Sequence, residues 1–307
     1  MTKLLVAVGV AATGTTDNIE VLDLASPITT CKTLPNFPLA VSGAIGGLGY
    51  RNNPIICGGS TSPTNFTNKC YSLNESEWLS SPTMMSPKTF AAISVSPNLI
   101  TSNKLFVTGG QINSSSWQNT IEVLTPTGWE TLPQSLPVNI YLQCSVLVNS
   151  STVMIIGGSQ YYAVCLTNTY YFNIDNHILT SGPPLNTGRC QHTCGRIRKG
   201  PLSLELSIIA AGGYGLSSVE ILDEASNDWK AGPQLPLGIY ASQMIEDPNG
   251  GVILVGGISD LNGFENSLYQ LPHGGAGAVW TKKEQKLKIG RYWHVAFLVP
   301  DYMVDCS

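Results

Sequence analysis

The residues best suited to hold a metal ion stand close together near position 190. Cys190, His192 and Cys194 alternate along one segment, so a β-strand would present all three side chains on one face. Alternate residues of a strand lie roughly 6 to 7 Å apart, which spreads the three donors too widely for one tetrahedral zinc ion unless the strand bulges. We therefore expect no metal and no cofactor.

Motifs for catalysis do not stand out either. We find no serine elbow with histidine and aspartate partners, no Gly-x-x-x-x-Gly-Lys-Ser/Thr phosphate loop and no His-Glu-x-x-His pair. Of the four histidines, His192 and His294 follow a repeated word described below, which predicts satisfied core residues. The catalytic residues, if there are any, stay unknown, and the sequence favours a protein that is not an enzyme.

Cations and aromatic residues are the remaining candidates for ligand contact. An arginine offers a planar fork of donors and aromatic rings offer stacking faces, so together they suit an acidic peptide, a carboxylate or an anionic glycan. The candidates are Lys88, Arg189, Arg291, Trp117, Tyr161, Tyr162 and Tyr214. Whether they meet depends on the elements that carry them.

Composition narrows the class of protein. Of the 307 residues 43% are hydrophobic and only 12% are charged, which allows a large core. The formal net charge is -4 without any run of like charges, so neither a nucleic-acid surface nor a polybasic membrane patch is expected. No apolar stretch approaches the length needed to span a bilayer.

The chain repeats a short apolar run that ends in glycine. Each run is rich in β-branched residues and too apolar for a half-exposed strand, which predicts a strand buried on both faces. The first glycines of the six copies lie 44 to 55 residues apart, a spacing typical of propeller blades. The copies begin at Leu4, Ile55, Leu105, Val153, Ile208 and Val252.

Three further strands accompany most copies. A half-buried strand follows the glycines, with nearly the same word at 19–23, 121–124 and 219–223. A third strand carries Trp78, Trp129, Trp229 or Trp280, which we expect to pack between sheets. A fourth strand, visible at 188–193, 238–243 and 290–295, precedes the next apolar run.

These features resemble the kelch repeat family over essentially the whole chain. The resemblance implies one all-β domain over 1–307, a six-bladed β-propeller of four-stranded antiparallel blades. It also implies that the cations opening the inner strands, among them Arg189 and Arg291, commonly serve structure through hydrogen bonds to neighbouring blades, which is the favoured alternative to a role in ligand binding. The first copy departs from the pattern with Gly9-Val10, and the fourth has His177 and Ile178 where tryptophan is expected.

The ends of the chain predict how the first blade is completed. Leu4 to Gly9 is a second strand without a first, and Arg291 to Val299 is a first strand without a second. We therefore expect blade 1 to be shared between 1–35 and 290–300, which leaves no open sheet edge. Residues 4–12 also resemble a signal-peptide core, but the repeat favours a strand, so any secretion signal would precede Met1.

The blade arrangement also predicts cysteine pairs. Cys57 ends one strand and Cys70 lies in the neighbouring strand of the same blade, and Cys31 and Cys306 lie on one face of blade 1. Cys165 and Cys190 share a face in neighbouring blades. This leaves Cys144 and Cys194 either paired or free.

Eight cysteines and four Asn-x-Ser/Thr sequons indicate an extracellular, secreted glycoprotein. The predicted glycosylation sites are Asn65, Asn74, Asn113 and Asn149. We expect a scaffold that binds a protein or glycan ligand at the face where the inner strands begin. The alternatives are a sugar-directed enzyme of the epimerase or oxidase type and a structural assembly subunit; ligand and oligomeric state stay open.

Overall fold

The computed structural model describes residues 2–26, 31–96, 104–161 and 164–306. The chain divides into two compact units, a first unit of Met1–Tyr141 with Trp293–Ser307 and a second unit of Leu142–Tyr292. Both are built from short β-strands, with two 3-10 turns, η1 (Tyr50–Asn52) and η2 (Asp301–Met303), in the first unit. None of the described helices is long and apolar enough to cross a membrane.

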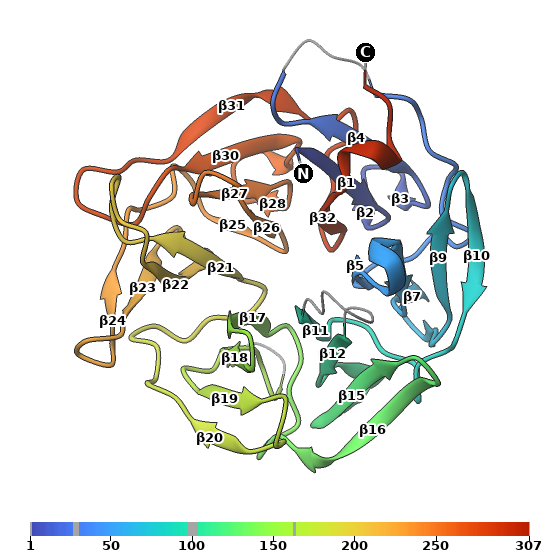
Figure 1. Cartoon of the computed structure of the whole chain (residues 1–307), viewed down its shortest axis with the longest axis horizontal. Coiled ribbons are helices and arrows are strands. Elements are labelled where there is room, and N and C mark those ends of the chain that lie inside the picture. Colours follow the sequence, from blue (N-terminus) through green and yellow to red (C-terminus); the bar gives the residue numbers. More distant parts are fainter. Residues whose placement is uncertain (1, 27–30, 97–103, 162–163, 307) are drawn as a thin grey trace. The chain divides into compact units, whose positions relative to one another are not determined.

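The first unit contains three antiparallel sheets and three small hairpins (Figure 1). In sheet order, the strands are β32 (Val295–Val299), β1 (Lys3–Ala7) and β4 (Ile19–Asp23); β5 (Ile45–Leu48), β6 (Pro54–Cys57), β9 (Cys70–Asn74) and β10 (Glu77–Ser81); and β11 (Ala92–Ser96), β12 (Lys104–Thr108), β15 (Thr120–Thr125) and β16 (Gly128–Ser135). The hairpins are β2 (Val10–Ala11) with β3 (Gly14–Thr15), β7 (Ser60–Ser62) with β8 (Asn65–Phe66), and β13 (Gln111–Asn113) with β14 (Ser116–Trp117).

The second unit contains three four-stranded antiparallel sheets and one small three-stranded sheet. The large sheets are β17 (Cys144–Asn149), β18 (Thr152–Ile156), β19 (Thr169–Asn173) and β20 (Leu179–Ser181); β21 (Thr193–Arg198), β22 (Leu206–Ala211), β23 (Val219–Asp223) and β24 (Asp228–Ala231); and β26 (Gln243–Glu246), β27 (Val252–Val255), β30 (Ser267–Leu271) and β31 (Thr281–Lys286). The small sheet is β25 (Ile239–Tyr240), β28 (Ile258–Ser259) and β29 (Gly263–Phe264).

The last strand of the chain pairs with the first, as the sequence predicts. β32 runs antiparallel to β1 with Val299 opposite Lys3 and Val295 opposite Ala7, and the two strands lie side by side in Figure 1. A disulfide joins Cys31 to Cys306 just beyond this sheet. The two ends of the sequence are therefore held in one sheet of the first unit.

The apolar runs form the most buried strands of each sheet. β27 is buried along its whole length, and its neighbours β26 and β30 cover both of its edges. Within each unit the inner strands lie next to one another, β5 between β32 and β11, and β21 between β17 and β26. Stacking sheets in this way buries both faces of every middle strand, which explains their unbroken apolar sequence.

The four repeated tryptophans lie in the cores between neighbouring sheets, as expected. Trp78 packs with Leu5 and Val8 of the preceding sheet, and Trp229 packs with Met154 and Ile156. Trp129 and Trp280 occupy the equivalent cores. The indole of Trp229 also donates to the Pro183 carbonyl at 2.9 Å, so an aromatic side chain and a hydrogen bond tie adjacent sheets together.

The second glycine of each pair connects its sheet to the start of the next inner strand. The Gly59 N–H donates to the Lys88 carbonyl at 2.7 Å, and the Gly158 N–H donates to the Arg189 carbonyl at the same distance. Gly59 has a φ of 92°, and a Cβ there would lie 2.9 Å from the Ser42 carbonyl oxygen. Glycine is therefore required both for the turn and for the close approach.

Candidate functional site

Each inner strand is entered through a residue in the left-handed backbone region. We call the residue four positions before each inner strand its strand opener. The six left-handed residues stand two positions after these openers, and five of them are not glycine. Their φ values run from 50° to 63° at Gly43, Phe90, Leu142, Gln191, Ala241 and Trp293. Such conformations are unfavourable for most side chains and collect where the surrounding structure enforces them, often at functional sites.

Backbone hydrogen bonds link these left-handed residues from one sheet to the next. In the first unit the Gly43 N–H donates to Trp293 O and the Phe90 N–H donates to Gly43 O, both at 2.9 Å. In the second unit the Gln191 N–H donates to Leu142 O at 3.0 Å and the Ala241 N–H donates to Gln191 O at 2.8 Å. The bonds account for the strained backbone, since the left-handed turn aims each N–H at the neighbouring sheet.

Aromatic side chains gather over this part of the first unit. The rings of Phe90 and Trp293 lie 4.6 Å apart, and a Cβ at Gly43 would lie 2.5 Å from the Phe90 ring. The glycine at this one position therefore leaves room for the ring of its neighbour. The sequence interpretation did not single out these residues. They could have been found from their common position, two residues after each strand opener.

The predicted ligand cations are buried within the fold. Lys88, Arg189 and Arg291 have relative exposures of 1%, 0% and 0%. The Arg189 guanidinium makes five hydrogen bonds, to Glu220 Oε1 from two nitrogens, to the carbonyls of Gly212 and Ser218, and to Ser218 Oγ. Because a guanidinium has five N–H donors, none remains for a ligand.

Lys88 occupies the same place in the first unit. Its ammonium lies 2.8 Å from Glu122 Oε1 and donates to Thr120 Oγ1 at 2.9 Å. Burial lowers the pKa of Lys88, while the charge of Glu122 and the hydrogen bond to it oppose that shift. Lys88 and Arg189 thus have a structural role, as the kelch resemblance implies, but their acceptors lie in or beside β15 and β23 of the sheet that each leads into and not in a neighbouring sheet.

These cations recur in every second sheet. The strand openers read Val41, Lys88, Ile140, Arg189, Ile239 and Arg291 along the chain. The second residue of the half-buried strand alternates in the same way, as Glu20, Tyr71, Glu122, Tyr170, Glu220 and Tyr269. A cation and a glutamate thus mark alternate repeats, while an aliphatic residue and a tyrosine mark the others, so the sequence has a period of two sheets.

Of the predicted aromatic residues, Trp117 ends the hairpin strand β14, and Tyr161 and Tyr214 lie in loops. Trp117 packs on Tyr141 in the first unit, with ring centroids 5.4 Å apart. Tyr161 and Tyr214 in the second unit are 66% and 60% exposed, whereas Tyr162 lies outside the described residues. The accessible part of the predicted site is therefore aromatic and not cationic.

Tyr214 belongs to an aromatic cluster that we define as Tyr214, Tyr240, Phe264 and Tyr292 in the second unit. Tyr214 contacts Tyr240 edge to face at 5.3 Å, and Phe264 contacts Tyr292 at 5.6 Å. Burial raises the pKa of Tyr240, and the nearby charges of Asp260, Tyr214 and Tyr292 raise it further. Tyr240 of the first ring pair and Tyr292 of the second are thus near enough to interact electrostatically.

The sequence interpretation named only Tyr214 of this cluster. Tyr240 and Tyr292 directly follow strand openers, as Tyr141 does in the first unit, and Phe264 stands in the loop strand β29. The recurrence of an aromatic residue one position after the opener was the signal that could have found them. Pairing each with a loop aromatic required the fold.

His192 is buried beside Arg189, and neither of its ring nitrogens has a hydrogen-bond partner among the described residues. Its burial is as expected, and no side chain or backbone group of the described residues pairs with its ring nitrogens. Burial, followed by the charge of Arg189, lowers the pKa of His192 to about 3. The imidazole is consequently neutral at physiological pH.

All eight cysteines form disulfides. The pairs are Cys31–Cys306, Cys57–Cys70 and Cys165–Cys190, together with Cys144–Cys194, which the sequence left open. Cys190 and Cys194 lie close together in the sequence but form disulfides with different partners, Cys165 and Cys144. Within the described ranges no cluster of three or more His, Cys, Asp or Glu residues could hold a metal ion.

The four sequon asparagines are all exposed and lie in or beside short hairpins of the first and second units. Asn65 and Asn113 belong to β8 and β13, and Asn74 and Asn149 end β9 and β17. Each is accessible to a glycosylating enzyme, and their modification stays a prediction.

Comparison with known proteins identifies the architecture. No protein-family model matches the chain, and no curated protein matches its sequence. The solved structure of YjhT, a kelch-like propeller, is similar with a TM-score of 0.74, covering 92% of this chain and 94% of that one at 12% identity. The chain has a β-propeller fold. At this identity the likeness extends to the fold alone, so a propeller assigns the scaffold and not the ligand.

Proposed function

We propose that this propeller is a binding scaffold whose ligand, a protein or a glycan, docks on the aromatic cluster of the second unit. The observation that carries the proposal is the exposure of Tyr214 at 60% and Phe264 at 39%, although each is packed against a second ring. Exposed aromatic rings held by their neighbours present large contact area at little cost in side-chain entropy. Such residues supply most of the binding energy in many interfaces.

The chemistry of the cluster favours a ligand with hydroxyl or amide groups. Three of its four members are tyrosines, whose rings offer apolar faces and whose hydroxyls donate and accept hydrogen bonds. Asp260 lies near Tyr240, while Arg189 has no donor left and Arg291, which precedes Tyr292, is fully buried. An anionic ligand, which the sequence suggested, is therefore less suited to this surface than a neutral one.

We further propose that both units form one six-bladed domain of kelch type. The same backbone hydrogen bond, from the second residue of the glycine pair to the next strand opener, recurs at six described positions beginning with Gly9 and ending with Gly257. The pairing of β32 with β1 supports a first blade shared between the two ends of the sequence. A single cooperative unfolding transition is the expected outcome.

Four disulfides and four exposed sequons support a secreted glycoprotein. We expect the secreted protein to show no free thiol under denaturing conditions, and to lose mass on treatment with a glycosidase that removes N-linked glycans. Free thiols together with an unchanged mass would contradict this localisation.

Arrays of glycans and of purified extracellular proteins test the binding function. The native protein should bind a defined subset of ligands, and Tyr214→Ala should weaken that binding by about tenfold or more, because it removes the most exposed ring of the cluster. Tyr302→Ala is the matched control, since Tyr302 is 79% exposed and lies in the first unit.

Equal binding by Tyr214→Ala and the native protein, or no ligand at all, would contradict the proposal. A sugar that is chemically altered after incubation with the protein would indicate the sugar-directed enzyme. A concentration-dependent oligomer that covers the cluster, measured by sedimentation, would favour a structural subunit.

A further inference from the structure

The connection between β21 and β22 carries two leucines that the fold leaves in solvent. We call residues 199–205 the leucine loop. Leu202 and Leu204 are 96% and 87% exposed, more than any other large hydrophobic residue that the structure describes. Single exposed leucines are common on protein surfaces, but two in one short loop form an apolar tip.

The equivalent connections of the second unit are shorter and polar. Ser150 and Ser151 join β17 to β18, and residues 247–251, an aspartate, a proline, an asparagine and two glycines, join β26 to β27. The neighbouring sheets therefore make this turn without leucine. The two leucines are not needed to close the hairpin, and their exposure means that they do not serve the core either.

Hydrogen bonds inside the leucine loop hold its tip in place. The Lys199 N–H donates to the Glu205 carbonyl at 3.0 Å. The Ser203 N–H donates to the Gly200 carbonyl at 3.2 Å, and Ser203 Oγ accepts from the Glu205 N–H at 3.1 Å. A retreat of the leucines toward the sheet would break these bonds, so the loop presents them in one ordered conformation.

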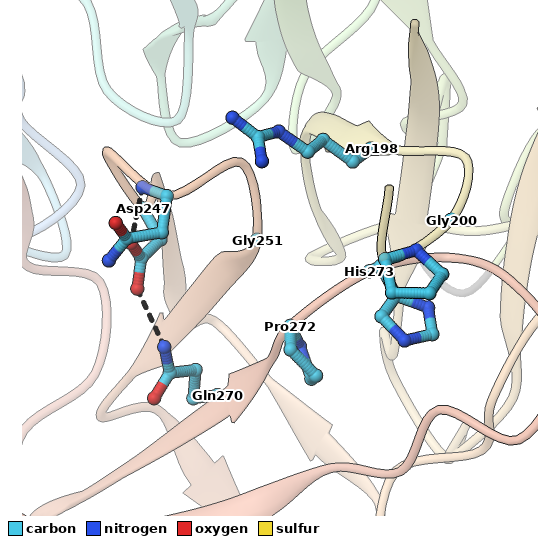
Figure 2. A pocket seen from close by; sticks show the side chains of 9 residues that line it. Arg198, Gly200, Asp247, Gly251, Gln270, Pro272 and His273 are labelled. Carbon is cyan, nitrogen blue, oxygen red and sulfur yellow. Dashed lines mark hydrogen bonds between the residues drawn. The ribbon is translucent and has the colours of Figure 1, made fainter. Parts of the chain in front are cut away.

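The base of the leucine loop is packed against the segment that follows β30. The Gly274 N–H donates to the Arg198 carbonyl at 2.7 Å, and a Cβ at Gly275 would lie 2.7 Å from the Lys199 carbonyl oxygen. A pocket of about 230 Å³ lies beside this base, with Arg198 and Gly200 among the residues that line it (Figure 2). The apolar tip therefore extends from an anchored base.

The charges around the base of the loop do not favour an anionic partner. Lys199 pairs with Glu205 at 3.0 Å. The hydrogen bond to Glu205 raises the pKa of Lys199, and the charges of Glu205, Glu224 and Asp223 raise it further. These three carboxylates outnumber the two cations of the base, Lys199 and Arg198. An anionic surface would therefore gain no net attraction here, whereas a surface without net charge is not repelled.

The apolar area of the tip distinguishes between possible partners. Two leucine side chains can remove roughly 250 Å² of apolar surface from water. Each partner of a standard protein interface buries about 800 Å², so the tip alone does not supply a stable contact with a protein or with a second copy of the chain. Insertion into lipid needs no shaped partner, and its strength scales with the apolar area inserted. Lipid offers no hydrogen-bond partners, a condition that the internal bonds of the loop help to meet.

We propose that the leucine loop inserts into the surface of a neutral, zwitterionic phospholipid membrane and holds the protein there. Leu202 and Leu204 enter the boundary between headgroups and acyl chains, and the charged base stays among the headgroups. The loop follows β21 at Arg198, whereas Tyr214 of the aromatic cluster donates its N–H to the Cys190 carbonyl, which precedes β21. The inference does not depend on what the aromatic cluster binds.

Flotation with vesicles of pure phosphatidylcholine tests the insertion. The native protein should float with the vesicles in a saturable manner as the lipid concentration rises. Leu202→Ser should lower the partition coefficient by about tenfold, because a side chain that leaves water for lipid is replaced by a polar one. Leu202→Met keeps an apolar side chain and should retain most of the binding.

Leu261→Ser is the matched control, since Leu261 is 83% exposed and lies between β28 and β29 of the same unit. It should float as the native protein does. Urea denaturation should give the same midpoint for Leu202→Ser and the native protein, which separates a loss of insertion from a loss of fold. Adding phosphatidylserine to the vesicles should not strengthen the binding.

Three results would overturn the proposal: no flotation of the native protein, equal flotation of Leu202→Ser and the native protein, or flotation that requires phosphatidylserine. Sedimentation without lipid gives a fourth. A concentration-dependent dimer that Leu202→Ser abolishes would identify a second copy of the chain as the partner of the loop.

Discussion

The buried ion pairs of the two units occupy the same place in the repeat but use different chemistry. Lys88 pairs with Glu122 in the first unit, and Arg189 pairs with Glu220 in the second. All four side chains are buried. The lysine contacts its carboxylate at one point, whereas the guanidinium reaches Glu220 from two nitrogens and also binds the backbone of the loop before β23.

Both carboxylates also accept hydrogen bonds from the segment that leads into the inner strand. Glu122 accepts from the Met85 N–H and the Ser86 hydroxyl, and Glu220 accepts from the N–H groups of Asn186 and Thr187. Each glutamate therefore fixes the segment that leads into the inner strand. The comparison teaches that the repeat requires a buried glutamate at this place, while the cation that balances it can be either type.

Removing the glutamate should have the largest effect. Glu220→Ala should lower the free energy of unfolding by about 3 to 5 kcal/mol, because it leaves a buried cation without its partner. Glu122→Ala should cost less, because burial lowers the pKa of Lys88 and the lysine can release its proton, whereas arginine cannot. Urea denaturation under non-reducing conditions measures both changes.

Glu205→Ala is the control for these two variants. Glu205 pairs with Lys199 at 3.0 Å, but its side chain is 74% exposed, so its removal should change stability little. A loss for Glu220→Ala no larger than that for Glu205→Ala would show that the buried pair is not what stabilises the sheet.

Exchanging the arginine for lysine tests whether the two pairs are interchangeable. Arg189→Lys should cost about 2 to 3 kcal/mol, because an ammonium with three donors cannot serve the five hydrogen bonds that Arg189 makes. Arg198→Lys, at a half-buried arginine without an acceptor in the described chain, is the control and should cost much less. Equal costs would mean that the point charge alone matters in the second unit, as in the first.

Acid should destabilise the second unit through His192. The folded-state pKa of His192 is about 3 against 6.5 in the unfolded chain, so its contribution is fully present above pH 6.5 and is lost as the pH falls toward 3. Between pH 7.5 and 5 this linkage removes roughly 2 kcal/mol. The sheet that Lys88 leads into has Ala91 at the equivalent position, which does not titrate.

Replacing His192 tests this difference between the sheets that Lys88 and Arg189 lead into. His192→Gln uses the side chain that the repeat carries at Gln143, and it should flatten the fall in unfolding free energy between pH 7.5 and 5. His177→Gln is the matched control, because it makes the same substitution at a histidine that is only partly buried. An unaltered slope in His192→Gln would contradict a buried neutral imidazole.

The smallest expected difference concerns two equivalent tryptophans. Trp229 Nε1 donates to the Pro183 carbonyl at 2.9 Å, whereas Trp129 Nε1 is buried without a partner in the described part of the chain. Trp229→Phe should therefore cost about 1 kcal/mol more than Trp129→Phe, since both lose similar apolar area but only one loses a hydrogen bond. Thermal unfolding of the two variants side by side measures the difference, and a larger loss for Trp129→Phe would refute it.

Sequence pattern was sufficient for the strands and for the way the ends meet. The short apolar run from Val252 predicts a strand buried on both faces, and the structure has this strand buried along its whole length. The regular spacing of the runs aligns the six copies with one another. The pairing of β32 with β1 was predicted because the first repeat lacks its first strand, while the end of the chain supplies a first strand that has no second strand after it. Three cysteine pairs followed from the same arrangement, because residues of neighbouring strands lie within bonding reach.

The tertiary structure decided what the candidate residues do. Arg189 stands four residues before β21 and Arg198 ends it. The first makes five hydrogen bonds to four acceptor atoms, whereas the second is half-buried and has no acceptor among the described residues. Residue type and spacing cannot separate them, because the acceptors of Arg189 come from residues 23 to 31 positions away in the chain. The sequence by itself determined the repeating strands, because local pattern and glycine turns suffice for them, whereas burial and hydrogen-bond partners depend on which distant segments the fold brings together.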